Sequence, residues 1–133
     1  MKKPLVTYAG TLLALLVLDG LWLGVLMAPT YRTLLGSLML PSPLLGPAAA
    51  FYLMYAAALV WFAVWPALRG TSALRAAGNA ALLGLAAYGT YDLTNWATLT
   101  GWPPLLVFID MAWGMLASAI AASVGFAVGR KLG

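Results

Sequence analysis

Four long apolar stretches, at residues 5–27, 47–68, 73–99 and 104–128, constrain this sequence more than any other feature. Each is long enough to cross a bilayer as a helix, which takes about 20 predominantly apolar residues. Prolines and glycines lie between the stretches, as is typical of helix boundaries. We therefore predict an all-α integral membrane protein, a four-helix bundle that forms a single transmembrane domain over residues 1–133.

The composition favours lipid rather than water as the surrounding medium. Hydrophobic residues make up 64% of the 133 residues and charged residues 8%, whereas a soluble domain has roughly 45–50% and 25%. Such a chain has too little polar surface to cover a water-soluble globule. The apolar excess is therefore expected to face the bilayer.

Two missing residue types exclude several kinds of site. The sequence contains no cysteine and no histidine, which rules out disulfides, thiolate or imidazole metal ligands, haem ligation and catalytic dyads built on histidine. The seven basic residues are scattered and form no patch, so nucleic acid is not an expected partner.

The placement of the basic residues predicts the orientation in the membrane. Six of the seven lie at the two termini or at positions 69 and 75, and only Arg32 lies on the other side. Because basic residues accumulate in cytoplasmic loops, we predict that both termini are cytoplasmic (N-in, C-in). The outer loop 29–46 has apolar residues at helical spacing, which suits a short interfacial helix, although an ordinary connector fits equally well.

All three acidic residues, Asp19, Asp92 and Asp110, lie inside predicted spans. An aspartate at the centre of a membrane helix costs roughly 2.5–3.5 kcal/mol on insertion scales, so three isolated ones would be a heavy burden for a small bundle. With a rise of about 1.5 Å per residue, each lies roughly 9–14 Å from the outer end of its helix. We therefore expect the three carboxyls to cluster at one level, in the outer half of the bilayer.

Aromatic residues accompany the aspartates at helical spacing. An Asp-x-x-Trp pattern occurs at 19–22 and again at 110–113, and residues three or four apart share a helix face. We predict an acidic, aromatic-walled pocket; the alternative is that the carboxyls only hold helices together, through hydrogen bonds of roughly 0.6–2 kcal/mol each. The residues expected to line the pocket are Trp22, Trp96, Trp113, Tyr52, Tyr55 and Tyr88.

Other residues are assigned to the frame of the protein. Trp61, Trp65 and Trp102 lie near span ends, where tryptophans commonly form an interfacial belt. Small residues recur every four positions from 117 to 129. This ridge predicts that a neighbouring helix approaches closely in the inner half of the bundle.

The expected chemistry is binding of a lipid or other amphiphile, or acid–base chemistry on it. Three carboxyls this close in a medium of low dielectric constant cannot all ionise, so at least one should stay protonated near neutral pH. A protonated and an ionised carboxyl can act together as general acid and base. We assign the base to Asp92 or Asp110, a positioning role to Asn95 and a partner role to Asp19.

Several alternatives stay open at this stage. Arg32 either binds lipid phosphate at the head-group level or pairs with the acidic residues and closes the loop as a lid. The protein could also be a proton- or cation-coupled transporter, although the inner half offers no charged group, or a non-catalytic accessory subunit with a membrane protein or a second copy as partner. Oxygen ligands suit divalent cations, but no loop motif supports one, so neither a metal nor a cofactor is expected.

The residues from 91 to 102 carry a pattern that resembles a known family. It reads Tyr91-Asp92-Leu93-Thr94-Asn95, then Thr98-Leu99 and Gly101-Trp102. Further matching motifs, in order, are Leu18-Asp19 with Leu21-Trp22-Leu23, Tyr31-Arg32 with Leu35-Gly36 and Leu38-Met39, Phe51-Tyr52-Leu53, and Asp110 with Trp113-Gly114. Over nearly the whole chain, the sequence resembles small bacterial membrane proteins catalogued as domain-of-unknown-function family 2177.

That resemblance implies a four-helix fold in the bacterial inner membrane and no established activity. The resemblance also implies that the genes of family members can lie beside genes for fatty-acid modification, which favours a lipid as the ligand. Trp96 and Thr100 depart from the family pattern, which often has leucine and a basic residue there. The outer rim is therefore expected to be less basic in this chain than in the family.

Overall fold

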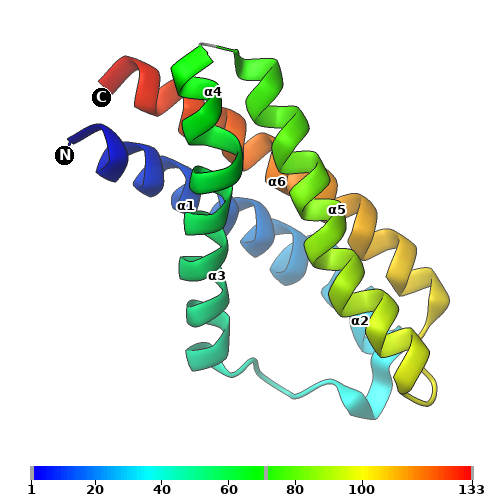
Figure 1. The fold of residues 1–133 in the computed structure, drawn as a ribbon. Helices are drawn as coiled ribbons and strands as arrows, with labels where there is room; N and C mark the ends of the chain where they lie inside the picture. Colours follow the sequence, from blue (N-terminus) through cyan, green and yellow to red (C-terminus); the bar gives the residue numbers. More distant parts are fainter. Residues whose placement is uncertain (1, 71, 133) are drawn as a thin grey trace.

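The computed structural model describes residues 2–70 and 72–132, and most of them are helical (Figure 1). No strand occurs in this part of the chain, which confirms the predicted all-α class. The elements in chain order are α1 (Lys2–Leu21), the π-helical segment η1 (Trp22–Leu26), α2 (Ala28–Leu35), the 3-10 turn η2 (Gly36–Leu38), α3 (Leu45–Leu59), the π-helical segment η3 (Val60–Val64), α4 (Trp65–Gly70), α5 (Ala73–Thr98) and α6 (Pro104–Leu132).

Three continuous helical stretches are long and apolar enough to cross a membrane. They are Lys2–Leu26, Leu45–Gly70 and Pro104–Leu132, with mean hydropathies of 2.0, 1.8 and 1.9. Helix α5 is long enough at 26 residues, but its polar side chains keep it below the hydropathy of the other three. A crossing by α5, which corresponds to the third predicted span, stays a prediction.

The observed helices extend beyond the apolar stretches at the two chain ends. Helix α1 already includes Lys2, and α6 continues to Leu132 rather than ending near residue 128. Backbone hydrogen bonding does not require apolar side chains, and long basic side chains can reach polar surroundings from a helix end. The π-helical turns η1 and η3 have no counterpart in the sequence prediction, because hydropathy does not report the register of backbone hydrogen bonds.

The segment 29–46, predicted to be an outer loop, contains most of the helix α2, followed by the short 3-10 turn η2. Pro29 lies in the first turn of α2, where its missing N–H leaves no helical bond unmade. The helix ends at Gly36, whose φ of 55° is open to glycine at little cost. Of the two interpretations left open by the sequence, the structure therefore has the short helix.

Helix α6 packs closely against both α1 and α5 because small residues lie at the contacts. A Cβ added to Gly125 would collide with Oγ1 of Thr11, and one added to Gly129 with Oγ1 of Thr7. A Cβ on Gly84 of α5 would come within 2.6 Å of Oγ of Ser118. The predicted small-residue ridge is thus where α1 approaches α6, as expected where packing rather than hydrophobicity joins helices.

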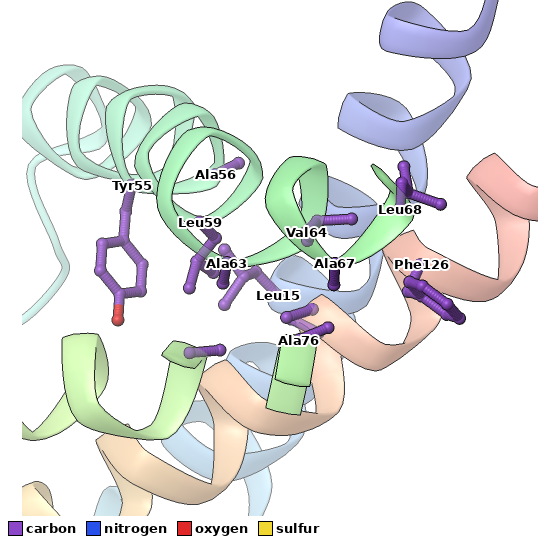
Figure 2. Packing of buried hydrophobic residues seen from close by; sticks show 13 residues of the cluster. Leu15, Tyr55, Ala56, Leu59, Ala63, Val64, Ala67, Leu68, Ala76 and Phe126 are labelled. Atoms are coloured by element: carbon purple, nitrogen blue, oxygen red, sulfur yellow. The ribbon is translucent and has the colours of Figure 1, made fainter. Parts of the chain in front are cut away.

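The interior is built largely from small residues, whereas large apolar side chains point outward. The main core includes Ala56, Ala63 and Ala67 from the helical stretch α3–η3–α4, around Leu59 and Leu15 (Figure 2). Large side chains on the outside include Leu13, Val17, Met54, Leu82 and Leu116, each more than half exposed. A surface of this kind suits lipid, and the chain is a membrane protein in its packing as well as in its composition.

The start of α1 and the end of α6 lie at the same end of the molecule as α4 and the start of α5 (Figure 1). The segment 27–44, which contains α2 and links η1 to α3, is called the connector here. The connector and the turn between α5 and α6 lie toward the opposite end (Figure 1). This arrangement separates a terminal end from a connector end. Which of the two faces the cytoplasm stays a prediction.

Candidate functional site

A cavity of about 470 Å³ lies among α1, η1, α2, α3, α5 and α6. Its wall is mostly aromatic and apolar, and two carboxyl groups interrupt it. Neither lysine nor arginine lines it in the described chain. The residues predicted for the site that do line the cavity are Asp19, Asp110, Trp22, Trp113, Tyr52 and Tyr88.

Asp19 is held by two hydrogen bonds, one to each carboxyl oxygen. The Tyr52 hydroxyl of α3 donates to Oδ2 at 2.6 Å, and the Trp113 indole N–H of α6 donates to Oδ1 at 2.8 Å. Asp19 itself is 5% exposed. Two donors on one buried carboxyl fix its direction, so these hydrogen bonds join α1, α3 and α6 at one point.

Asp110 accepts a hydrogen bond from the connector. The Tyr31 hydroxyl of α2 donates to Oδ1 of Asp110 and accepts a hydrogen bond of 3.0 Å from the Trp22 indole N–H. Burial, reinforced by the hydrogen bond to Asp110, raises the pKa of Tyr31 above its ordinary value. The hydroxyl therefore remains a protonated donor throughout the physiological pH range.

The two Asp-x-x-Trp motifs are joined across the cavity rather than within themselves. The Trp113 indole donates a hydrogen bond directly to Asp19, whereas the Trp22 indole is linked to Asp110 through the Tyr31 hydroxyl. The two indole rings stack face to face, with centroids 4.2 Å apart and planes 3° from parallel. The sequence predicted that each tryptophan flanks its own aspartate; instead each serves the other motif, because α1 and α6 run past one another in opposite directions.

Asp92 lies behind the cavity wall, next to the carboxyl of Asp110 and the indole of Trp102. It is fully buried, and neither of its oxygens has a hydrogen-bond partner in the described chain; the same holds for the Trp102 indole nitrogen. Trp102 is 9% exposed and packs with Tyr31 and Leu106. Its assignment to the interfacial belt is therefore wrong.

The three aspartates are all buried, but they do not form one tight cluster. Among residues 2–70 and 72–132, no three acidic side chains come together as metal ligands would. Asp92 and Asp110 are neighbours, whereas Asp19 is bound by Trp113, about one helical turn further along α6 than Asp110. The division arises because Tyr52 and Trp113 fix the Asp19 carboxyl at that depth.

Four other predicted residues lie outside the cavity lining. Asn95 is half-buried on α5, and Trp96 is 43% exposed and packs edge to face on Phe108 at 6.3 Å. Tyr55 is buried and shares a hydrogen bond of 2.6 Å with Ser118, which makes it part of the core below the cavity. Arg32 is exposed.

The contrast between Arg32 and its neighbour follows from helix geometry. Successive residues of an α-helix point about 100° apart, so when Tyr31 faces Asp110 the Arg32 side chain faces away. Tyr31 takes the inward role that one interpretation gave to Arg32. The helical spacing of Tyr31, Leu35 and Met39 was recognised in the sequence, but the three residues were not assigned to the cavity, which all of them line.

One comparison with known proteins gives a match. The model of a family described as predicted membrane protein (DUF2177) matches residues 4–127, a range that contains every site residue above. No curated protein and no solved structure matches the chain. The family has no assigned function, so it supplies membrane location and leaves the site to be interpreted from its own chemistry. On this match, the chain belongs to the DUF2177 family of predicted membrane proteins.

Proposed function

We propose that the protein binds a lipid or other amphiphile in the cavity, with the polar group of the ligand against Asp19 and Asp110 and its apolar part against the aromatic walls. The observation that carries this proposal is the pair of buried carboxyls facing an otherwise aromatic and apolar cavity. Burying a carboxyl inside a membrane protein costs free energy, so such a group indicates a functional site by default. A pocket of this kind is the usual form of a small-molecule site.

The polarity of the wall indicates which polar group fits. The donors Tyr31, Tyr52 and Trp113 are already directed at the carboxyl oxygens, and no basic side chain lines the cavity in the described residues. A ligand therefore meets carboxyl oxygens and the faces of aromatic rings. Both attract a cationic or strongly donating group, such as an amine or ammonium head group.

The topology indicates which half of the membrane holds the cavity. With both termini at one end of the molecule (Figure 1), an even number of crossings is required, which argues that α5 is the fourth. Under the positive-inside rule the terminal end is cytoplasmic. The cavity, which α2 helps to line, would then lie in the outer half of the bacterial inner membrane.

A filled cavity offers the most direct test. Ala87 lines the cavity, and Ala87→Phe would occupy its space without removing any hydrogen bond described above. Ala97→Phe is the matched control, because Ala97 is exposed on the same helix and does not line the cavity. The protein is purified in mild detergent, and retained amphiphiles are identified by mass spectrometry.

We expect the wild type and Ala97→Phe to retain the same amphiphile and Ala87→Phe to lose most of it. Asp19→Asn and Asp110→Asn should reduce retention if the polar group is cationic. Equal retention by Ala87→Phe and Ala97→Phe would place the ligand elsewhere. No retained amphiphile in the wild type, together with no binding of added amines, would contradict the proposal.

Acid–base chemistry on the bound amphiphile is a second candidate, favoured by the neighbouring carboxyls of Asp92 and Asp110. Two such groups in a buried setting hold one proton between them more readily than two charges. Asp110 faces the cavity and Asp92 does not, so Asp110 would exchange the proton with the ligand and Asp92 would store it. Infrared spectra near neutral pH should contain a protonated carboxyl band that Asp92→Asn removes; a band unchanged by that substitution would contradict the shared proton.

A further inference from the structure

A second groove lies at the terminal end of the molecule, where α4 leads into α5. It has a volume of about 620 Å³ and is lined by Trp61, Trp65, Pro66, Arg69, Gly70 and Arg75. From the sequence, Trp61 and Trp65 were expected in an interfacial belt, and Arg69 and Arg75 indicated the cytoplasmic side. Neither role explains why they enclose a common groove.

The groove joins two guanidinium groups from different helices. Trp65 and Arg69 are four residues apart on α4 and so lie on one face of that helix. Arg75, from the first turn of α5, folds back toward α4: its Nη1 atom is 3.7 Å from the position that a Cβ on Gly70 would occupy. The Ser72 hydroxyl accepts a hydrogen bond of 3.2 Å from the backbone N–H of Arg75, which fixes the direction in which α5 starts.

Nothing acidic balances these two charges in the described part of the chain. The sequence has three acidic residues, and all of them are buried around the other cavity or behind its wall. A guanidinium presents several N–H donors in a planar fork that matches a phosphate group. The chemistry of the groove therefore selects a phosphate rather than a cation or a neutral head group.

The surroundings of the groove favour a lipid over a soluble phosphate. Trp61 is 74% exposed and Phe62 beside it is 60% exposed, and on α5 Leu74 is 83% exposed. Trp61 lines the groove and Leu74 directly precedes Arg75, so these exposed side chains offer a surface along which acyl chains can lie. Indole rings are also suited to the head-group region of a bilayer, and basic pockets between membrane helices bind anionic head groups.

We infer that this groove is a binding site for an anionic phospholipid, whose head-group phosphate lies between Arg69 and Arg75 and whose acyl chains run past Trp61. The inference is independent of any ligand in the cavity near Asp19. It requires only that the terminal end of the molecule lies at a membrane surface.

The test compares two double substitutions that remove the same charge. Arg69→Gln with Arg75→Gln changes the groove, and Lys2→Gln with Lys131→Gln removes two exposed basic residues elsewhere on the chain. Binding of phosphatidylglycerol to the full chain in mild detergent is followed by native mass spectrometry. Phosphatidylcholine tests the need for net negative charge, and glycerol phosphate tests whether a soluble phosphate suffices.

We expect the arginine pair variant to bind phosphatidylglycerol about tenfold more weakly than the wild type, and the lysine pair variant to bind within about twofold of it. Arg69→Lys with Arg75→Lys keeps the charge without the planar fork and should give intermediate binding. It also serves as the folded comparison if the glutamine variant unfolds. Equal loss in both glutamine variants would show a diffuse charge effect, and equal affinity for glycerol phosphate would show a soluble-phosphate site; either result overturns the inference.

Discussion

Tyr31, in the connector helix α2, donates its hydroxyl hydrogen to Asp110 near the start of α6. The same hydroxyl accepts from the Trp22 indole of η1, so one side chain joins three segments of the chain. Leu35 and Met39 follow it along the cavity wall. The connector is thereby fastened to the carboxyl site, and its mobility should depend on a single hydroxyl.

Tyr31→Phe should release the connector. The substitution leaves the Asp110 oxygen and the Trp22 N–H without their partner, which costs about 1–3 kcal/mol when such groups are buried. Trypsin cleavage after the exposed Arg32 should become several-fold faster, as measured by limited proteolysis in detergent. Thr33→Val is the control, because the Thr33 hydroxyl donates a hydrogen bond to the Pro29 carbonyl within the same helix; equal rates in the two variants would contradict the role of Tyr31.

Trp113→Phe should destabilise the bundle while keeping an aromatic ring against Trp22. It removes one of the two donors to the buried Asp19, and a buried carboxyl that loses a partner costs about 1–3 kcal/mol. Thermal unfolding in detergent should show a lower midpoint for this variant. Trp96→Phe, at an exposed position, should stay within about 0.5 kcal/mol of wild type; a similar loss in both would mean that the indole N–H of Trp113 is unimportant.

Gly125→Ala should destabilise the contact of α1 with α6. The added methyl would collide with Oγ1 of Thr11, and overpacking of this kind costs about 1–3 kcal/mol. Gly78→Ala is the matched control, since a Cβ there meets nothing within 4 Å, and in a helix it should be neutral or stabilising by up to about 1 kcal/mol. Unfolding midpoints of the two variants should therefore move in opposite directions or differ clearly.

Reporter fusions test the orientation. A fusion to the C-terminus should report the cytoplasm, and one inserted between residues 41 and 46 should report the opposite side, because six of the seven basic residues lie toward the terminal end. The even number of crossings predicts the same contrast. Reports from the same side for both fusions would contradict a crossing by α5.

The sequence was sufficient for the helices and for the burial of the acids. Long apolar stretches and the insertion cost of a carboxyl act locally, so the long helices and the burial of each aspartate followed from their own segments, whereas the π-helical turns and α2 did not. The depth argument predicted one cluster of three carboxyls, whereas Asp19 and Asp110 line a cavity that Asp92 does not line. The sequence did not predict which tryptophan hydrogen-bonds to which aspartate. The bond from Trp113 to Asp19 depends on how α1 and α6 are rotated against each other, which hydropathy does not encode.

Some residues predicted for the site do not line the cavity, and their positions have identifiable reasons. Asn95 and Trp96 share the α5 stretch with Asp92, but they lie one turn nearer its end, where Trp96 packs on Phe108 instead. Tyr55 was expected beside Tyr52, yet three residues along α3 its hydroxyl meets Ser118 in the core. Helical spacing indicated the buried face for Tyr55 but not for the exposed Trp96, and in neither case did it indicate how far the cavity extends along the helix.

The face-to-face stack of Trp22 and Trp113 gives the protein an optical property. Two indoles this close and nearly parallel are coupled chromophores, so their ultraviolet transitions mix instead of absorbing independently. Circular dichroism in that region will then report the state of the cavity wall without an added label. A ligand that parts the rings, or a change in bilayer that shifts α1 against α6, would alter that signal before any helix unfolds.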